Sequence, residues 1–544
     1  MTWILGDLLD KVGSIVNGDA PATIHDNRIV TWPEFTRASN NLARAFLAAG
    51  ARTDDKVAFY MRNRPEYSEC FAACVKARLI HVNVNYRYRH DELHYILDNA
   101  DAVVIVYAAE FRENIQALKP DLPKVRLYVE ITDGGASLEF AQPYEALANT
   151  GDGRPLGIER SIEDGLFIYT GGTTGMPKGV MWRAGDFYQG ILDVGKTIRA
   201  VPANPDQLFA AVAANGRGLT SMPTCPLMHG TGFALMLGTL VSGGAVLTLP
   251  APSFDADEAW AAVDRHRADR MNIVGDAFAA PLARALDAAQ KRPGGRYDLS
   301  CVESISSSGV MWSMENKQAL LAHLPEVMLI DSFGASEALG FGGSVMTKDG
   351  VVATGKFTVS ETARVLDEDG QDVVPGSGQS GWLAAAGCLP QGYYKDPEKT
   401  AQVFKTYDGV RYAIPGDHCL VEADGTMTLL GRGSICINSG GEKIFPEEVE
   451  EVLKTHDLVT DALVVGVPDE RWGQAVTAVV DLVDGTGRED LDEAALRQHV
   501  HDRLAGYKVP KRVLAAEIPL RAANGKADYK AVRHFAADSL GITL

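Results

Sequence analysis

Short β-branched runs alternate with amphipathic helical patterns through the first half of the chain. The segment WPEFTRASNNLARAFLAAG (residues 32–50) repeats apolar side chains at helical spacing and ends at Gly50, a plausible C-cap. The run AVVIVY (102–107) follows a second helical pattern, DELHYILDNA, and suits a buried strand. Repeated βα units of this length predict an α/β fold with a largely parallel sheet covered by helices.

The pattern changes twice along the chain. From about Gly350, short strands are separated by Gly- and Asp-containing turns, and after Gly433 a compact helix–strand–strand–helix pattern follows. The 544 residues are too many for one core. We therefore expect an N-terminal domain over residues 1–432 and an α+β C-terminal domain over 433–544.

Charge and composition restrict the class of partner. The chain carries 52 basic and 71 acidic side chains, for a net charge of −19, which disfavours nucleic acid or an anionic membrane as a general partner. The most apolar runs, such as FALMLGTL, are too short for a transmembrane segment. A polyanion would need a local site that overcomes the field of the protein.

The cysteines indicate a reducing compartment. Their number is odd and no CxxC pair occurs, so buried thiols in the cytoplasm are the expected interpretation. The start, MTWILGDLLDKVGS, lacks a basic segment followed by an apolar core, and we expect no signal peptide. The seven cysteines are Cys70, Cys74, Cys225, Cys301, Cys388, Cys419 and Cys436.

The loop YTGGTTGMPKGV (169–180) has the composition of an anion-binding loop. Its glycines let backbone N–H groups approach an anion, its threonines add hydroxyl donors, and Lys178 adds charge. It is not a Walker A loop, because Pro177 stands where glycine must precede the lysine, and it lacks G-x-G-x-x-G spacing. By itself the loop leaves phosphate binding and a tight structural turn equally open.

Other candidate residues carry little weight singly. HDELH (90–94) places two histidines on one helical face, but Asp91 replaces the base of a zinc protease motif and no third ligand is at a recognisable spacing; a surface helix is favoured. His229 is by default a core histidine, and Lys526 a solvated lysine. Glu337, among small residues, weakly indicates a hard-cation ligand.

Seven motifs in order change this assessment. They are YTGGTTGMPKGV, PLMH, SSGVMWS, FGASE, PGD, GRGSICINSGGEKIFPEEVE and PLRAANGKAD. In this order they resemble the adenylate-forming superfamily of acyl-CoA synthetases, from TWPEF at residue 31 to Lys530. The resemblance implies a small β-barrel-like subdomain in the large domain and a small, mobile C-terminal domain.

The resemblance also implies the reaction. A carboxylic acid attacks the α-phosphate of ATP to give an acyl-adenylate and pyrophosphate, and coenzyme A then displaces AMP. ATP, Mg²⁺ and coenzyme A are therefore expected together with a small carboxylic acid, and no nucleic acid. Because an anion must approach a polyanion, the site has to supply cations and hydrogen-bond donors.

Phosphate and adenosine residues follow from the matching motifs. The loop residues implied for the phosphates are Thr170, Gly171, Gly172, Thr173, Thr174, Gly175 and Lys178. The residues implied for adenosine are Gly309, Val310, Met311, Asp331, Ser332, Phe333, Gly334, Asp417 and Arg432. Phe333 would stack on adenine and Asp417 would accept the ribose hydroxyls. Gly171 replaces a serine that is usual in the family.

The resemblance further implies catalytic roles. Glu337 would bind Mg²⁺, Ser336 would direct its hydroxyl to the α-phosphate, and Thr173 belongs to the catalytic group. His229 would orient the carboxylate at the mouth of the acyl pocket, and Lys526 would bridge the carboxylate and the α-phosphate.

The second half-reaction involves the C-terminal domain. In the family this domain rotates and presents a glycine loop to the pantetheine channel; the matching residues are Ser439, Gly440, Gly441, Glu442 and Lys443. The family hinge usually has Asp or Lys where GRGSI has Ile435. Backbone torsions near Gly433 can still provide a hinge, but the usual polar contact of the hinge is in question.

The acyl pocket is expected around His229–Gly230, residues 274–282 and the strands carrying Ser306 and Gly334. Alanines at 277, 279 and 280 leave two interpretations open, room for a bulky apolar acid or close packing of a helix. The motif sequences resemble those of actinobacterial fatty-acid and steroid-side-chain CoA ligases. This resemblance implies that the substrate is a long-chain or steroid-side-chain acid.

Rival functions remain at this stage. They are an adenylate-only enzyme, a peptide-synthetase adenylation module, a luciferase-like oxidase and a non-catalytic nucleotide-binding protein. No carrier domain is expected after Lys530, which disfavours the module. The intact charged residues of the motifs disfavour the non-catalytic alternative, and oligomeric state is not readable.

Overall fold

The computed structural model describes residues 3–171, 176–196, 199–292, 297–309, 312, 314–350, 356–432, 437–444, 446–483, 487, 491–520 and 528–544. Its contacts divide the chain into two units. The first contains residues 1–86, 97–169 and 179–431, and the second contains residues 87–96, 170–178 and 432–544.

A large sheet of the first unit begins with parallel strands. Its order is β2 (Arg28–Thr31), β1 (Pro21–His25), β11 (Ala245–Thr248), β10 (Thr220–Pro223), β12 (Arg270–Ile273), β13 (Ser304–Ser308) and β14 (Met328–Ala335). Every pair from β1 to β14 is parallel, whereas β2 is antiparallel to β1. The predicted largely parallel sheet is therefore confirmed for this part.

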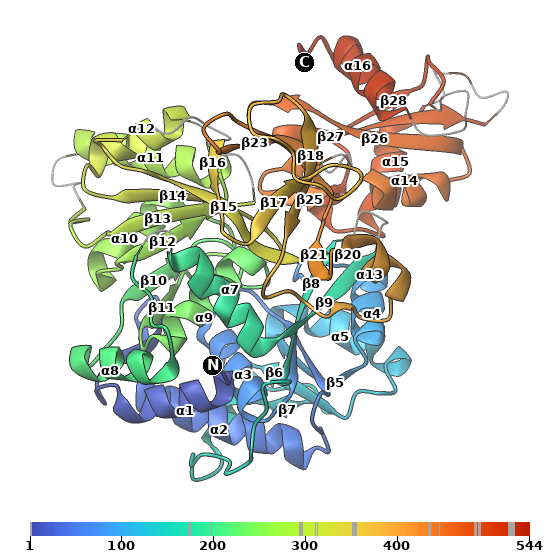
Figure 1. The fold of residues 1–544 in the computed structure, drawn as a ribbon. Coiled ribbons are helices and arrows are strands. Elements are labelled where there is room, and N and C mark those ends of the chain that lie inside the picture. The colour runs from blue at the N-terminus through green and yellow to red at the C-terminus, as the bar shows by residue number, and fades with distance from the viewer. Residues whose placement is uncertain are drawn as a thin grey trace. The chain divides into compact units, whose positions relative to one another are not determined.

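Helices connect these strands and supply the core. They are α9 (Gly230–Val241), α10 (Ala256–His266), α11 (Asp276–Lys291) and α12 (Met314–His323). In Figure 1, α11 and α12 lie beside β13 and β14. Trp260, Leu282 and Ile305 are fully buried in the cluster between helices and sheet. This burial, at about 1.5–3 kcal/mol for each large side chain, holds the strand ends in place.

The same sheet continues with antiparallel strands. They are β15 (Ala338–Met346), β16 (Lys356–Val359), β23 (Met427–Arg432), β22 (Asp417–Val421), β18 (Ser380–Ala385), β21 (Val410–Ala413) and β20 (Phe404–Tyr407), with β17 (Ala363–Leu366) on β18. The short strands predicted after Gly350 are thus present. They form an antiparallel extension of the large sheet.

Two smaller sheets complete the first unit. One is parallel, with the order β4 (Ile80–Asn83), β3 (Lys56–Tyr60), β5 (Ala102–Ala108), β6 (Leu127–Ile131) and β7 (Gln142–Pro143). The other contains β19 (Gly392–Tyr393), β9 (Pro177–Arg183) and β8 (Gly165–Gly171). The predicted strand at 102–107 is β5, which is buried along its whole length.

The remaining helices of this unit cover these sheets. They are α1 (Leu5–Ile15), α2 (Trp32–Ala48), α3 (Pro65–Lys76), α5 (Arg112–Leu118), α6 (Tyr144–Asn149), α7 (Ala184–Lys196), α8 (Pro205–Asn215) and α13 (Pro397–Val403). Helix α2 matches the pattern predicted at 32–50: Phe35, Leu42 and Phe46 are fully buried. A Thr31–Glu34 capping box begins it, and Gly50 follows with a positive φ of 91°.

The second unit is built on a sheet of its own. Its order is β25 (Glu442–Ile444), β24 (Ile437–Ser439), β27 (Gly473–Leu482) and β26 (Val459–Asp469), with β28 (Arg512–Ala515) on β27. Its helices are α14 (Pro446–Lys454), α15 (Glu493–His501), α16 (Tyr529–Leu540) and most of α4 (His90–Asn99). The predicted helix–strand–strand–helix order after residue 433 is confirmed.

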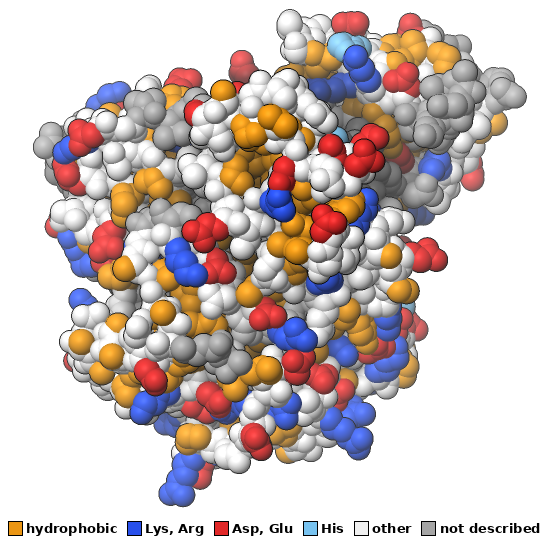
Figure 2. Space-filling model, in the orientation of Figure 1, with side chains coloured by type: hydrophobic (Ala, Val, Ile, Leu, Met, Phe, Trp, Pro, Cys, Tyr) orange, Lys and Arg blue, Asp and Glu red, His pale blue; other side chains and the backbone are white. Residues whose placement is uncertain are grey.

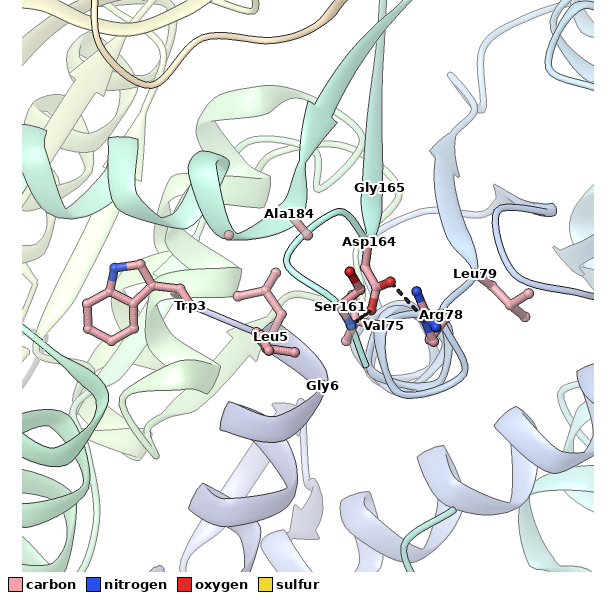
Figure 3. Close-up of a pocket in the computed structure, with 12 residues that line it drawn as sticks. Trp3, Leu5, Gly6, Val75, Arg78, Leu79, Ser161, Asp164, Gly165 and Ala184 are labelled. Atoms are coloured by element: carbon pink, nitrogen blue, oxygen red, sulfur yellow. Dashed lines mark hydrogen bonds and ion pairs between the residues drawn. The ribbon is translucent and has the colours of Figure 1, made fainter. Parts of the chain in front are cut away.

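A small cavity lies beside the first residues of β8. Trp3, Leu5, Leu79 and Ala184 are among its lining residues, and Asp164 accepts a hydrogen bond from Arg78 there (Figure 3). Its volume of about 10 Å³ is room for about one water molecule. An acyl chain or a nucleotide does not fit in it.

Acidic and basic side chains are interspersed on the face shown in Figure 2. Among the helices that the structure describes, none combines the length and the apolar character needed to cross a membrane. The described cysteines Cys70, Cys74, Cys225, Cys301, Cys388 and Cys419 are free thiols.

Candidate active site

The carboxyl ends of four parallel strands meet at one edge of the large sheet. The registers Pro223↔Asn272 and Ile273↔Ser307 bring the ends of β10, β12 and β13 nearly level, and Ser308 at the end of β13 pairs with Ser332, three residues before the end of β14. From β10 the chain proceeds to β11 on one side, and from β12 to β13 on the other. Ligands of open α/β sheets bind at such a switch point, outside the carboxyl ends.

Gly309 and Phe333 follow the paired residues Ser308 and Ser332 directly, so the sequence-predicted adenine residues come together at this edge. Gly309 has a φ of 92°, which favours glycine. The ring of Phe333 lies 5.6 Å from that of Phe341 and 5.7 Å from that of Phe357.

Ser336 and Glu337 form the tight turn between β14 and β15, where Ala335 pairs with Ala338. The indole of Trp182 donates to the Ser336 carbonyl at 2.9 Å. The Tyr393 hydroxyl donates to Glu337 Oε1 at 2.6 Å, and Glu337 is 9% exposed. A carboxyl group that accepts one hydrogen bond from a phenol has further oxygen lone pairs, and carboxylate oxygens are ligands that a hard cation prefers.

Asp331, six residues before Glu337, has a different environment. Its carboxylate lies 2.9 Å from Lys317 Nζ, and both side chains are buried. Burial raises the pKa of Asp331 above its usual value, and Lys317 opposes that shift. The sequence placed Asp331 beside the nucleotide; the structure shows its carboxylate engaged in an internal ion pair.

Asp417 is the first residue of β22 and is 5% exposed. Strand β22 pairs with β18, where Trp382 lies opposite His418 and the centroids of the two rings are 3.7 Å apart. A carboxylate at a strand end can accept two hydroxyl hydrogen bonds from a vicinal diol. Asp417 therefore remains the candidate for the ribose.

His229 is the N-cap residue of α9, and asparagine side chains hold the backbone on both sides of it. Asn63 Nδ2 donates to the Cys225 carbonyl at 2.9 Å, and its Oδ1 accepts from Leu227 N–H at 2.7 Å. From β12, Asn272 donates to the Thr231 carbonyl at 2.8 Å. Sequence reasoning missed both asparagines.

The second unit holds the other described candidates. Thr170 on β8 and Lys178 on β9 flank the loop that the sequence predicts for phosphate. Ser439 and Glu442 pair across the β24–β25 turn, which contains Gly440 and Gly441. Glu442 forms an ion pair with Arg87.

Several predicted site residues lie outside the described residues. These are Gly172, Thr173, Thr174, Gly175, Val310, Met311 and Lys526, together with the hinge residue Ile435 and the side chains of Arg432 and Lys443. Their assigned roles stay predictions.

The HDELH segment is the start of α4. His90 and Asp91 are exposed, whereas Glu92 is buried and pairs with Lys508 at 2.6 Å within the second unit. Across the described part of the chain, no group of three or more His, Cys, Asp or Glu side chains is arranged to hold a metal ion.

The alanines of the predicted acyl pocket differ in burial. Ala277 is exposed and Ala280 is half-buried. Ala279 is fully buried in the core beside Trp260 and Leu282, so at this position the small side chain serves helix packing.

Comparison with known families decides the class of this site. The AMP-binding enzyme model matches residues 15–394, and the AMP-binding enzyme C-terminal domain model matches residues 448–526. The chain belongs to the AMP-binding enzyme family. The resemblance to adenylate-forming acyl-CoA synthetases is thereby confirmed.

Two relatives are similar over nearly their whole length. One is a 3-oxocholest-4-en-26-oate–CoA ligase of Rhodococcus rhodochrous, 40% identical over 100% of this chain and 97% of the relative. The other is a medium/long-chain-fatty-acid–CoA/3-oxocholest-4-en-26-oate–CoA ligase of Mycolicibacterium smegmatis. It is 41% identical over 96% and 93% of the two chains.

Solved structures support the α/β fold. The amide bond synthetase McbA from Marinactinospora thermotolerans superposes with a TM-score of 0.79 at 23% identity, covering 97% of this chain and 99% of that chain. A Mycobacterium tuberculosis fatty acyl CoA synthetase superposes with a TM-score of 0.66 at 20% identity, covering 98% of each chain. The predicted large α/β N-terminal part and small C-terminal part agree with these structures.

Proposed function

We propose that this protein is an ATP-dependent acyl-CoA ligase. It converts a carboxylic acid and ATP to an acyl-adenylate and pyrophosphate, and then coenzyme A and the adenylate to the thioester and AMP. The observation that carries the proposal is 40% identity, over the whole chain, to a named CoA ligase. It is thus an acid–thiol ligase of the AMP-forming type.

The substrate is a medium- or long-chain fatty acid or a steroid side-chain acid. Relatives at 40–41% identity are named for these acids, whereas a feruloyl-CoA synthase from Amycolatopsis sp is only 30% identical. An apolar acid also suits a site beside the glycine- and leucine-rich helix α9, GTGFALMLGTLV.

Phe333 and Gly309 bind the adenine, and Asp417 binds the ribose. This proposal is supported by the pairing of Ser308 with Ser332, which places Gly309 and Phe333 side by side, and by the burial of Asp417 at its strand end. Arg432 assists at the ribose. Thr170, Lys178 and the loop between them hold the β- and γ-phosphates, with backbone N–H groups as additional donors.

Glu337 holds the Mg²⁺ that arrives with ATP, and Tyr393 fixes the carboxylate for it. The ion would supply positive charge next to the phosphate oxygens. His229 orients the substrate carboxylate at the start of α9, where the helix dipole also favours an anion. Lys526 bridges the carboxylate and the α-phosphate, so its ammonium group stabilises the charge that builds up between them.

The second half-reaction uses the β24–β25 turn, from Ser439 to Lys443, beside the pantetheine arm of coenzyme A. Free thiols at the described cysteines are consistent with function in the cytoplasm.

Pyrophosphate exchange tests the first half-reaction. The protein is incubated with ATP, Mg²⁺ and labelled pyrophosphate, and with dodecanoate, hexadecanoate, 3-oxocholest-4-en-26-oate or ferulate. In a second incubation with each acid, coenzyme A replaces the labelled pyrophosphate, and CoA esters are measured by mass spectrometry. We expect exchange and a CoA ester with one of the first three acids, and loss of exchange in Lys526→Ala. Exchange without any CoA ester would indicate an adenylate-only enzyme. No exchange with any acid would indicate a nucleotide-binding protein.

A further inference from the structure

Asn83 lies where a polar side chain is unexpected. It is the last residue of β4, a strand that is buried along its length, and it is itself 4% exposed. Asparagine is disfavoured in strands, and burying its amide costs free energy unless its donors and acceptor are satisfied. The hydrogen-bond partners of this side chain therefore indicate its purpose.

All three partners are backbone groups, and they belong to two distant segments. Asn83 Nδ2 donates to the Tyr169 carbonyl at 3.0 Å and to the Met228 carbonyl at 2.5 Å. Its Oδ1 accepts from the Tyr169 N–H at 2.7 Å. Two carbonyls on one side and an N–H on the other fix the orientation of the amide, because a carboxamide supplies two N–H donors at its nitrogen and an acceptor at its oxygen.

The two segments are the ones that lead into the predicted phosphate and acyl sites. Tyr169 directly precedes Thr170 at the start of the phosphate loop, and Met228 directly precedes His229. The Tyr169 ring is fixed as well: its hydroxyl donates to Asn99 at 2.8 Å. A Cβ at Gly179 on β9 would lie only 2.8 Å from the ring, so this close approach requires glycine.

We propose that Asn83 is a positioning residue that fixes the His229 turn and the strand entering the phosphate loop relative to each other. The inference rests on the proposed ligase function and deepens it. Asn83 does not touch substrate; it acts through the backbones of Tyr169 and Met228. Because adenylation needs the carboxylate and the phosphates in one geometry, Asn83 affects the binding of both substrates.

Two other asparagines provide matched controls. Asn63 also holds the His229 turn, but its side chain bonds to Pro223, Cys225 and Leu227 instead of β8. Asn41 is buried like Asn83 and also joins two backbone segments, donating to the Ala148 carbonyl at 2.9 Å and accepting from Gly153 N–H at 3.1 Å. Both of its partners lie after β7, outside the candidate site.

The test measures KM for dodecanoate and for ATP in pyrophosphate exchange, together with Tm. Asn83→Ala should raise both KM values by about tenfold, the order expected for one lost buried hydrogen bond. Asn63→Ala should raise only the dodecanoate KM, and Asn41→Ala should lower Tm without changing either. The inference is overturned if Asn83→Ala behaves like either control. A wild type without exchange on any acid overturns the proposed function, and the inference with it.

A measurement on the wild type covers the case in which Asn83→Ala does not fold. Dodecanoate alone, without ATP, should slow hydrogen–deuterium exchange at the Tyr169 amide, because that N–H is bonded to Asn83 and Asn83 to the His229 turn. Unchanged exchange at Tyr169, with protection at residues 225–233, would contradict the inference.

Discussion

Asp331 and Glu337 lie six residues apart around the end of β14, and both are buried acids with one clear partner. Asp331 meets the ammonium group of Lys317 at 2.9 Å, whereas Glu337 meets the phenol of Tyr393 at 2.6 Å. The Asp331 carboxylate is paired with a cation inside the fold, whereas the Glu337 carboxyl group is oriented by a neutral donor and has no lysine or arginine among its hydrogen-bond partners in the described part of the chain. The difference separates an acid that stabilises the protein from an acid available to a cation.

The largest effect is expected from Lys317→Met. Removing the ammonium leaves the Asp331 charge buried without compensation, which costs about 3–5 kcal/mol of stability. Burial already raises the pKa of Asp331 above its usual value of 3.8, so the folded state binds a proton more readily than the unfolded chain. The stability contributed by this group therefore falls as the pH rises from that value through the raised pKa. In urea unfolding, Lys317→Met should therefore lose more unfolding free energy relative to the wild type at pH 8 than at pH 5. Equal losses at the two pH values would contradict the ion-pair interpretation.

Glu337→Gln should affect catalysis instead. The amide oxygen can still accept the Tyr393 hydrogen bond, so Tm should stay close to that of the wild type, but the charge is lost. We expect pyrophosphate exchange to fall by about 100-fold or more, as for loss of a group that stabilises transition-state charge. An unchanged rate of pyrophosphate exchange would show that Glu337 is not part of the active site.

Tyr393→Phe tests whether the phenol orients Glu337, and its expected effect is smaller than that of Glu337→Gln. The variant retains the Glu337 carboxyl group but loses the hydrogen bond that orients it, and partners of metal ligands typically contribute about 10–100-fold to metal affinity. The Mg²⁺ concentration for half-maximal exchange should rise by about tenfold at an unchanged maximal rate. A fall in maximal rate with an unchanged Mg²⁺ midpoint would point to another role for Tyr393.

His81 extends the comparison to a buried base with a phenol partner. Its Nε2 lies 2.8 Å from the Tyr67 hydroxyl, its ring stacks on Phe233 of α9, and burial lowers its pKa to about 3. The unfolded chain binds a proton near pH 6.5, so stability should fall below that pH by up to about 1.4 kcal/mol per pH unit. His81→Phe should remove this slope in urea unfolding from pH 6.5 to 5.

Tyr67→Phe is the control for that experiment, because it removes the same hydrogen bond but retains the imidazole. It should keep the acid slope. If His81→Phe retains the full slope, another group is responsible for the loss of stability in acid.

The elements of the fold could be predicted because local patterns determine them. The β-branched run at 102–107 is buried on both faces in β5, and the stripe of Phe35, Leu42 and Phe46 faces the core from α2. The assignment of Gly309 and Phe333 to adenine comes from family motifs and stays a prediction, and the parallel register of β13 and β14 explains why the two residues lie at the same edge of the sheet.

The partners of the site residues could not be predicted, because tertiary contacts select them. Tyr393 lies 56 residues from Glu337 in sequence, and Asn83 lies 86 and 145 residues from its two partners. No local sequence pattern indicates that these positions are hydrogen-bond partners. One signal was available: the asparagine in IHVN (80–83) ends a fully buried strand, and a buried amide in such a place needs specific partners.

Magnesium titration of pyrophosphate exchange, in Glu337→Gln and Asp331→Asn side by side, tests the central claim most directly. Glu337→Gln should require more Mg²⁺ and exchange more slowly while its Tm is retained. Asp331→Asn should lose Tm while its Mg²⁺ midpoint stays that of the wild type. The opposite result, a shifted Mg²⁺ midpoint in Asp331→Asn and an unchanged one in Glu337→Gln, would contradict the account.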